Sequence, residues 1–173
     1  MSFLKTVRRR ISDPPVRKSV FDILEDSPLC SMATIGPRGQ PHINTAYFAY
    51  SPGLELFFLS DPTSLHCRNV ERNPAMAMTI FNSRQVWGGS DRGMQLFGTC
   101  REAKGPHRRN AERAYARRFP PYAKWMRGTR PQERRDAEQL RSYTFYRFVP
   151  SRVKILNEPV FGGGVFVVAP VRR

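Results

Sequence analysis

The sequence predicts a mainly β fold, a barrel of mixed connectivity built from short strands, with helices packed outside it. Short segments of alternating or β-branched apolar residues recur along the chain, and Gly and Pro turns separate them. A helical pattern interrupts these segments between about residues 106 and 140. The chain has 173 residues, of which 40% are hydrophobic, so it is long enough for one domain with a substantial core. We therefore expect residues 1–173 to form a single domain.

The elements follow from local patterns. Residues 1–12 form a basic N-terminal arm, and a helix follows Asp13, because two prolines suit its first turn and apolar residues recur at helical spacing until Ser27. A short helix is expected from Thr63 to Arg72, and Gly98 is expected at a bulge or a close backbone approach. The expected strands are Leu29 to Ile35, Gln40 to Tyr50, Leu54 to Leu59, Ala75 to Phe81, Gly93 to Ala103, Tyr143 to Val149, Val153 to Leu156 and Val165 to Ala169.

The chain is strongly basic. It has 29 Lys and Arg against 14 Asp and Glu, a formal net charge of +15 at pH 7, which favours anionic partners such as nucleic acid or phosphorylated small molecules. In residues 101–141, however, acidic residues are interspersed at helical spacing, as is typical of a solvated helix face. No helix-turn-helix, zinc-finger or aromatic RNA-binding motif is present. We therefore expect a small-molecule substrate rather than nucleic acid.

Other function classes are not indicated. No apolar run approaches the roughly 20 residues of a membrane span, and the basic N-terminus precedes no apolar block, so we expect a cytoplasmic protein without a membrane partner. Three cysteines without a Cys-x-x-Cys pair favour neither a disulfide framework nor a zinc cluster. Cys30 and Cys100 alternate with apolar strand residues and are expected to be buried. No His or carboxylate cluster predicts a metal site.

The most informative segment is the junction of a strand and a short helix between Ser60 and Asn69. Free N–H groups and the positive end of the helix dipole make such a junction suited to an anion. Four side chains add hydrogen-bond donors around it: Ser60, Ser64, His66 and Arg68. The segment therefore favours a phosphate ligand, although an ordinary capped turn is consistent with the same residues.

These motifs resemble the FMN-binding split barrel of the pyridoxamine 5'-phosphate oxidase-like superfamily. The resemblance is carried by Ser64-x-His66-x-x-Asn69 followed by Asn73-Pro74, by the strands on either side and by the glycine-bearing strand at Gly98. It covers most of the chain. It implies an α+β, mainly β fold: an antiparallel, Greek-key-like split barrel with outer helices and a helical insertion at about residues 106–140.

The resemblance also implies a site for FMN. One strand would run past the flavin ring and ribityl chain, and its residues are His42, Asn44, Thr45 and Ala46. Ser60, Ser64 and His66 correspond to residues that hold the FMN phosphate in the family, and Arg68 can assist them. Arg92 occupies the place of an Arg-Gln pair at the start of the fifth strand, where Gln95 can replace the missing glutamine.

The chain departs from the family at two of these positions. The family usually has lysine where this chain has His66, and a neutral imidazole supplies one donor and no charge. Arg68, the helix N-terminus or a raised pKa of His66 can compensate, or phosphate binding is lost. Asn44 stands roughly where the enzyme that names the superfamily carries a phosphate-binding arginine. These departures argue against pyridoxamine phosphate oxidase activity itself.

Two function classes remain. The first is an FMN-dependent oxidoreductase acting on a small molecule, in which the flavin carries the redox chemistry and no catalytic residue is assigned. A deazaflavin or haem is the alternative cofactor, because the superfamily has exchanged ligands on this barrel. The second class is a non-enzymatic protein that carries flavin or binds nucleic acid.

A homodimer is also expected. Split barrels of this kind resemble half-sites that close when two subunits pack together. The strands carry more aromatic residues than we expect one small barrel to bury: Tyr47, Phe48, Tyr50, Phe57 and Phe58. A two-fold interface would cover them and leave two equivalent cofactor sites.

Overall fold

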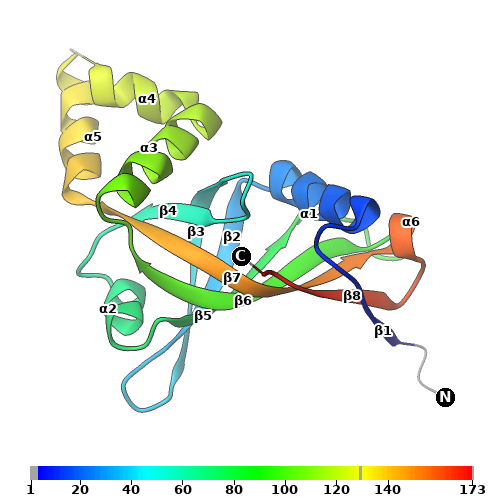
Figure 1. Cartoon of the computed structure of the whole chain (residues 1–173). Helices are drawn as coiled ribbons and strands as arrows, with labels where there is room; N and C mark the ends of the chain where they lie inside the picture. Colours follow the sequence, from blue (N-terminus) through cyan, green and yellow to red (C-terminus); the bar gives the residue numbers. More distant parts are fainter. Residues whose placement is uncertain (1–3, 129, 173) are drawn as a thin grey trace.

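The computed structural model describes residues 4–128 and 130–172 (Figure 1). In chain order its elements are β1 (Lys5–Arg8), α1 (Pro14–Asp26), β2 (Leu29–Ile35), β3 (Pro41–Tyr50), β4 (Leu56–Ser60), α2 (Leu65–Arg72), β5 (Ala75–Phe81), β6 (Arg92–Glu102), α3 (Pro106–Arg118), α4 (Pro120–Arg127), α5 (Pro131–Ser142), β7 (Thr144–Asn157), α6 (Glu158–Phe161) and β8 (Val165–Pro170).

Six of the strands close into a barrel. The sheet order is β1-β8-β7-β4-β3-β2-β5-β6, and β6 pairs in addition with β7, which joins the two ends of the six-strand section. Every pair within this section is antiparallel. The expected antiparallel split barrel with outer helices is confirmed.

The core lies inside the barrel and beneath α1. Alternate residues of the strands point inward, so that Met32, Phe48 and Leu96 are almost fully buried. The helix α1 packs against β5, β6 and β7 with one apolar stripe, formed by Val16, Val20, Ile23 and Leu24. Burying a side chain of this size contributes roughly 1.5–3 kcal/mol, so α1 is a major part of the core.

The two strands expected at residues 143–149 and 153–156 are one continuous strand, β7, so that prediction of a break was wrong. Pro150 sits inside it where the register between β6 and β7 shifts at Gly98, and a bulge tolerates a residue without an N–H. A Cβ atom on Gly98 would lie 2.1 Å from the carbonyl oxygen of Val149 and 2.7 Å from Cα of Pro150. The expectation of a bulge and a close backbone approach at Gly98 is therefore confirmed.

We expect Gly98→Ala to destabilise the protein by about 3 kcal/mol, because the added methyl group must push two backbones apart at the seam of the barrel. Urea unfolding measures this change. Gly53→Ala is the matched control, since a Cβ atom there meets nothing closer than Ser51 Oγ at 3.7 Å. Equal stability of the two variants would contradict the role given to Gly98.

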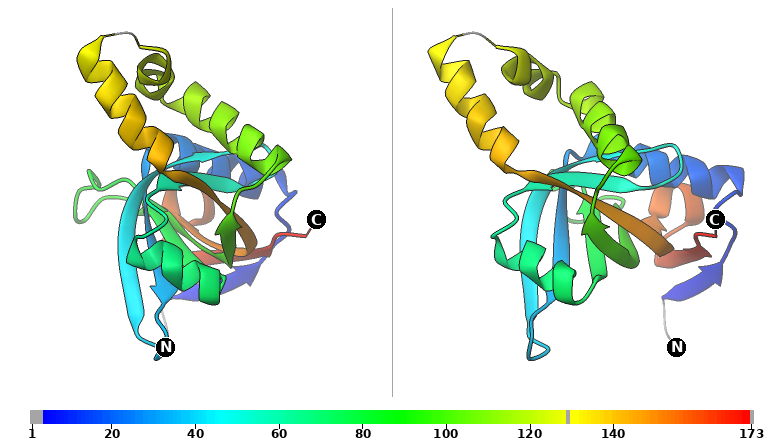
Figure 2. Two further views of the ribbon diagram at one scale, coloured as in Figure 1. Left: turned by 90° about the vertical axis from the view of Figure 1, so that its left-hand side faces the viewer. Right: turned by 60° about the vertical axis from the view of Figure 1, so that its left-hand side comes forward.

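The insertion consists of α3, α4 and α5, and Figure 2 shows α4 and α5 projecting from the barrel. It covers a second apolar cluster on the outside of the barrel, which includes Phe57 of β4 and Phe145 of β7. Arg118 at the end of α3 ties it to the C-terminal end of α1. Its Nη2 atom donates to the carbonyl oxygens of Leu24 and Ser27, the latter at 2.9 Å.

Two further expectations need correction. Part of the basic N-terminal arm is the edge strand β1, which pairs in parallel with β8, while residues 1–3 lie outside the described residues. Phe48, Phe57 and Phe58 are completely buried, because the barrel encloses two of them and the insertion covers Phe57. Of the aromatic residues expected at the surface, Tyr47 is 55% exposed.

None of the helices in the described ranges is long and apolar enough to span a membrane.

Candidate functional site

The turn between β4 and α2 is organised by Asp61. Its Oδ1 atom accepts hydrogen bonds from the backbone N–H of Thr63 at 2.8 Å and from the Thr63 hydroxyl at 2.7 Å. These bonds hold the pKa of Asp61 below its usual value. They also keep Thr63 out of the helix, so α2 begins at Leu65 rather than at the expected Thr63.

The N-terminus of α2 carries no side-chain cap. Ser64 is the N-cap residue, and its hydroxyl bonds to no helical N–H. The first helical hydrogen bond runs from Arg68 N–H to the carbonyl oxygen of Ser64 at 3.1 Å. The N–H groups of residues 65–67 therefore have no acceptor within the helix, and they lie at the positive end of its dipole.

His66 joins this turn to strands β3 and β4. Its Nε2 atom lies 2.8 Å from the hydroxyl of Ser60 and 3.2 Å from that of Ser64. The imidazole is 6% exposed and stacks with that of His42, with ring centroids 6.4 Å apart and planes 4° apart. Burial, and then the neighbouring His42, lower the pKa of His66, so its imidazole is neutral at pH 7.

Strand β3 places two predicted residues beside His42. His42, Asn44 and Ala46 are half-buried on one face of the strand, whereas Thr45 points to the other face and lies 3.3 Å from the Ser31 hydroxyl. Asn44 donates its side-chain N–H to the carbonyl oxygen of Thr45 at 3.3 Å. The structure thus brings together His42, Ser60, Ser64 and His66, with Asn44 and Ala46 on the same face of β3.

The remaining predicted residues lie elsewhere. Arg68 is exposed, and two residues of helix correspond to about 200° of rotation, so it lies on nearly the opposite side of α2 from His66. Arg92 forms an ion pair with Asp26. Arg92 and Gln95 line a different cavity of about 300 Å³, which lies along β6 between β5 on one side and β7 and β8 on the other. Within one chain they do not reach the group around His66.

The profile of the pyridoxamine 5'-phosphate oxidase family matches residues 16–157, which is most of the chain. This protein belongs to the pyridoxamine 5'-phosphate oxidase-like family of FMN-binding split barrels. The sequence matches no curated protein at a significant level.

Solved structures of the same fold include both FMN-binding and heme-binding family members. A heme-binding protein from Mycobacterium smegmatis has a TM-score of 0.68 and 14% identity, over 88% of this chain and 57% of that one. A pyridoxamine 5'-phosphate oxidase-related, FMN-binding protein from Nostoc punctiforme has a TM-score of 0.59 and 14% identity, over 86% and 87% of the two chains. The heme storage protein HutZ from Vibrio cholerae has a TM-score of 0.57 and 14% identity, over 82% and 91%. At these identities the likeness establishes the fold alone.

The donors around His66 suit the phosphate group of an FMN of this family, but they are neutral. The hydroxyls of Ser60 and Ser64 lie next to His66 Nε2 at the start of α2, whose first N–H groups have no side-chain cap, and a phosphate oxygen can accept hydrogen bonds from such groups. Nε2 of His66 presents either one proton or one lone pair, so it makes one good hydrogen bond, with the nearer hydroxyl of Ser60. The hydroxyl of Ser64 therefore remains able to donate to a ligand. The lysine usual in the family would have added a full charge here.

Sequence analysis missed two residues that hold α2 in place. Asn69 donates its side-chain N–H to the hydroxyl of Thr34 at 3.0 Å, and both side chains are fully or almost fully buried. Thr34 on β2 is the cross-strand neighbour of His42 on β3, so this bond fixes α2, about one turn beyond His66, against the strand that pairs with β3. The inward position of a polar residue in the alternating strand β2 is the signal that could have revealed it.

The buried, neutral state of His66 predicts a pH dependence of stability. Its folded pKa lies below the unfolded value of about 6.5, so the unfolded chain binds a proton more readily. The stability is fully present above about pH 6.5 and falls, as the pH decreases towards the folded pKa, by at most about 1.4 kcal/mol per pH unit.

Urea unfolding of the wild type and of His66→Gln at a series of pH values measures this contribution. We expect the wild type to lose more stability than the variant between about pH 7 and pH 5, because glutamine does not titrate. His107→Gln is the control, since His107 is exposed. Parallel curves for the wild type and His66→Gln would contradict the buried, neutral imidazole.

Proposed function

We propose that this protein binds FMN and is an FMN-dependent oxidoreductase acting on a small molecule. The observation that carries the proposal is the turn between β4 and α2. Two hydroxyls, a histidine and the free N–H groups at the start of a helix lie in this turn, in the segment that by resemblance would correspond to the phosphate site of the family. The family membership supports a flavin as the molecule that carries this phosphate.

The residues of the chain would bind and orient the cofactor. Ser60 and Ser64 would donate their hydroxyls to the phosphate, together with the N–H groups at the start of α2. His42, Asn44 and Ala46 would lie along the cofactor on the exposed end of β3. Bound FMN supplies hydride or electron transfer, so the protein needs to contribute position and exclusion of water rather than a catalytic acid or base.

Titration with FMN and with riboflavin tests the phosphate anchor. We expect the wild type to quench FMN fluorescence with a Kd in the micromolar range and to bind riboflavin at least about tenfold more weakly, because riboflavin lacks the phosphate. Ser60→Ala combined with Ser64→Ala should remove most of this difference. Ser83→Ala, an exposed serine in the loop before β6, should leave it unchanged. Equal affinity for the two flavins in the wild type would refute the anchor.

Haem is a second candidate cofactor, and a specific observation favours it. His42 and His66 lie side by side, and imidazole is a common axial ligand of haem iron. Two solved structures of the fold are named as heme-binding or heme-storage proteins. Addition of hemin to the purified protein should then give a Soret band that His42→Ala abolishes. A flavin spectrum without such a band favours FMN.

We also propose that the protein is a homodimer. The outer face of β2, β3 and β5 exposes large apolar side chains that one chain leaves uncovered: Leu29 (40%), Ile35 (38%), Ile43 (71%), Tyr47 (55%) and Phe81 (47%). Apolar patches of this kind typically mark an interface in soluble proteins. A second copy of the chain, packed by two-fold symmetry, would cover them.

Light scattering on the eluting protein tests the dimer. We expect twice the mass of one chain at micromolar concentration, and a monomer for Ile43→Asp, because a buried carboxylate without a partner is costly at an interface. Val160→Asp places the same charge on an exposed valine of α6, outside this face, and should remain dimeric. A monomeric wild type would contradict the proposal.

A further inference from the structure

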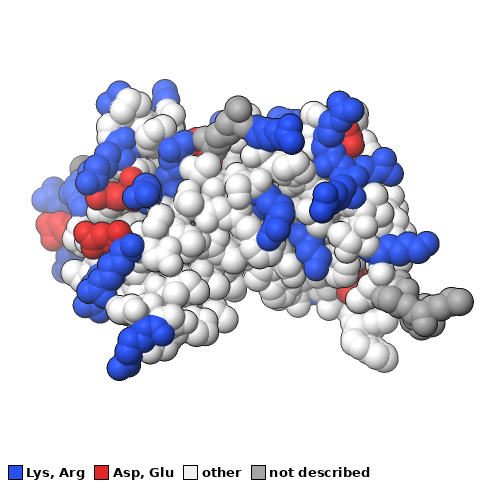
Figure 3. Space-filling view, turned by 60° about the horizontal axis from the view of Figure 1, so that its bottom comes forward, with Lys and Arg blue, Asp and Glu red and all other residues white. Residues whose placement is uncertain are grey.

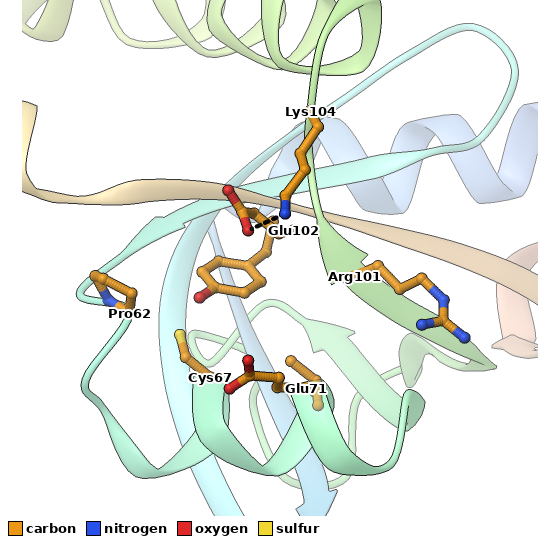
Figure 4. A pocket seen from close by; sticks show the side chains of 8 residues that line it. Pro62, Cys67, Glu71, Arg101, Glu102 and Lys104 are labelled. Carbon is orange, nitrogen blue, oxygen red and sulfur yellow. Dashed lines mark ion pairs between the residues drawn. The ribbon is translucent and has the colours of Figure 1, made fainter.

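A second polar cavity lies against a different face of α2 from the one that carries His66. It has a volume of about 380 Å³ and opens between α2, the end of β6 and β7 (Figure 4). The residues that line it are Pro62, Cys67, Val70, Glu71, Arg101, Glu102, Lys104 and Tyr146. None of the residues grouped around His66 is among them. The volume falls in the range of small-molecule sites.

The floor of this cavity is uncharged and firmly held. The ring of Tyr146 is 6% exposed and stacks on Phe58, with centroids 5.3 Å apart and planes 13° apart. Burial, and then contact with the Cys67 thiol, raise the pKa of Tyr146, so its hydroxyl stays protonated at neutral pH. The floor therefore offers apolar surface, from this ring and Val70, together with one phenol.

The rim carries charges of both signs. Lys104 Nζ lies 3.1 Å from the carboxylate of Glu102, and these two charges offset each other. Glu71 on α2 and Arg101 on β6 have no ion pair and no side-chain hydrogen bond to any residue in the described ranges 4–128 and 130–172. Figure 4 shows the Glu71 carboxylate turned toward the cavity and the Arg101 side chain at its edge.

A glutamate without an ion-pair partner in the described part of the chain, such as Glu71 at this rim, is unusual for so basic a chain. Figure 3 shows a face of the molecule on which Lys and Arg far outnumber Asp and Glu. A simple anion would find many positive side chains on such a surface, whereas a partner for Glu71 must be positive. A molecule that carries an ammonium and a carboxylate on a short apolar body could form ion pairs with Glu71 and Arg101 at once. Its apolar part would then contact the apolar floor of the cavity.

We propose that this cavity binds a small zwitterion of the amino-acid class, with its ammonium group at Glu71 and its carboxylate toward Arg101 and Lys104. The Tyr146 ring and Val70 would contact the apolar side chain. The site is separate from the proposed FMN site and does not depend on it. Its function would be to bind a second small molecule next to α2.

Calorimetric titration of the full-length protein with three matched compounds tests the charge requirement. L-Valine carries both charges, isobutylamine carries the ammonium alone, and isovalerate carries the carboxylate alone. We expect L-valine to bind with a Kd of about 1 mM or lower, and each analogue to bind at least about tenfold more weakly, because each loses one charge-assisted contact. No binding of L-valine, or equal binding of either analogue, would overturn the proposal.

Two variants locate the binding. Glu71→Gln and Arg101→Gln alter exposed side chains, so both should fold, and each should weaken L-valine binding about tenfold or more. Glu138→Gln and Arg109→Gln make the same changes at exposed positions on α5 and α3 and should bind L-valine as the wild type does. Binding that is unaffected by both cavity variants would place L-valine elsewhere and overturn the assignment. FMN titration of the same variants should give the wild-type result.

Discussion

The fold depends on the closure of the barrel between β6 and β7. The two strands pair along nearly the full length of β6, and this pairing brings the ends of a six-strand sheet together. It requires a position without a side chain, because at Gly98 the backbone of the neighbouring strand fills the space of a Cβ atom. Closure also positions the candidate site, since the hairpin of β2 and β3 and the turn after β4 are held by the strands of the closed barrel.

Sequence patterns predicted the parts of the fold that local chemistry decides. Turn residues, apolar alternation and the helical spacing of α1 and the insertion are properties of short segments, and those elements were found. The exposure of Phe57 could not be predicted, because it depends on the insertion packing over β4, which is a contact distant in sequence. The continuity of β7 through Pro150 was missed for a related reason, since the irregularity that accommodates the proline, with Ser151 as the extra residue of β7, arises in the pairing with β6, which is distant in sequence.

In the candidate site, too, the contacts between residues close in sequence were predictable and the long-range contacts were not. Ser60, Ser64 and His66 are close in sequence, and their proximity in space was predictable. That Arg68 lies on the far side of α2 follows from the helical period once the start of the helix is known, and the hydrogen bonds of Asp61 shift that start to Leu65. The contribution of Asn69 and Thr34 is a long-range contact between buried polar groups, which the spacing of residues does not reveal.

The site as a whole offers neutral donors where the family usually provides a charge. A phosphate here would be held by hydroxyls, helix N–H groups and an imidazole whose burial favours its neutral form. A bound phosphate would shift this balance, because a nearby negative charge favours the protonated ring. The affinity for FMN should therefore depend on the protonation of His66, which would not be true of a lysine at the same position.

The most direct test compares the FMN affinity of the wild type and of His66→Lys at about pH 6 and pH 8. At pH 8 we expect the variant to bind FMN about tenfold more tightly than the wild type, because lysine places a full charge beside the phosphate. At pH 6 we expect this difference to become smaller, because the imidazole of the wild type can take up a proton, while the titration of the FMN phosphate itself affects both proteins alike. Equal affinities of the two proteins at both pH values would contradict a phosphate site at His66.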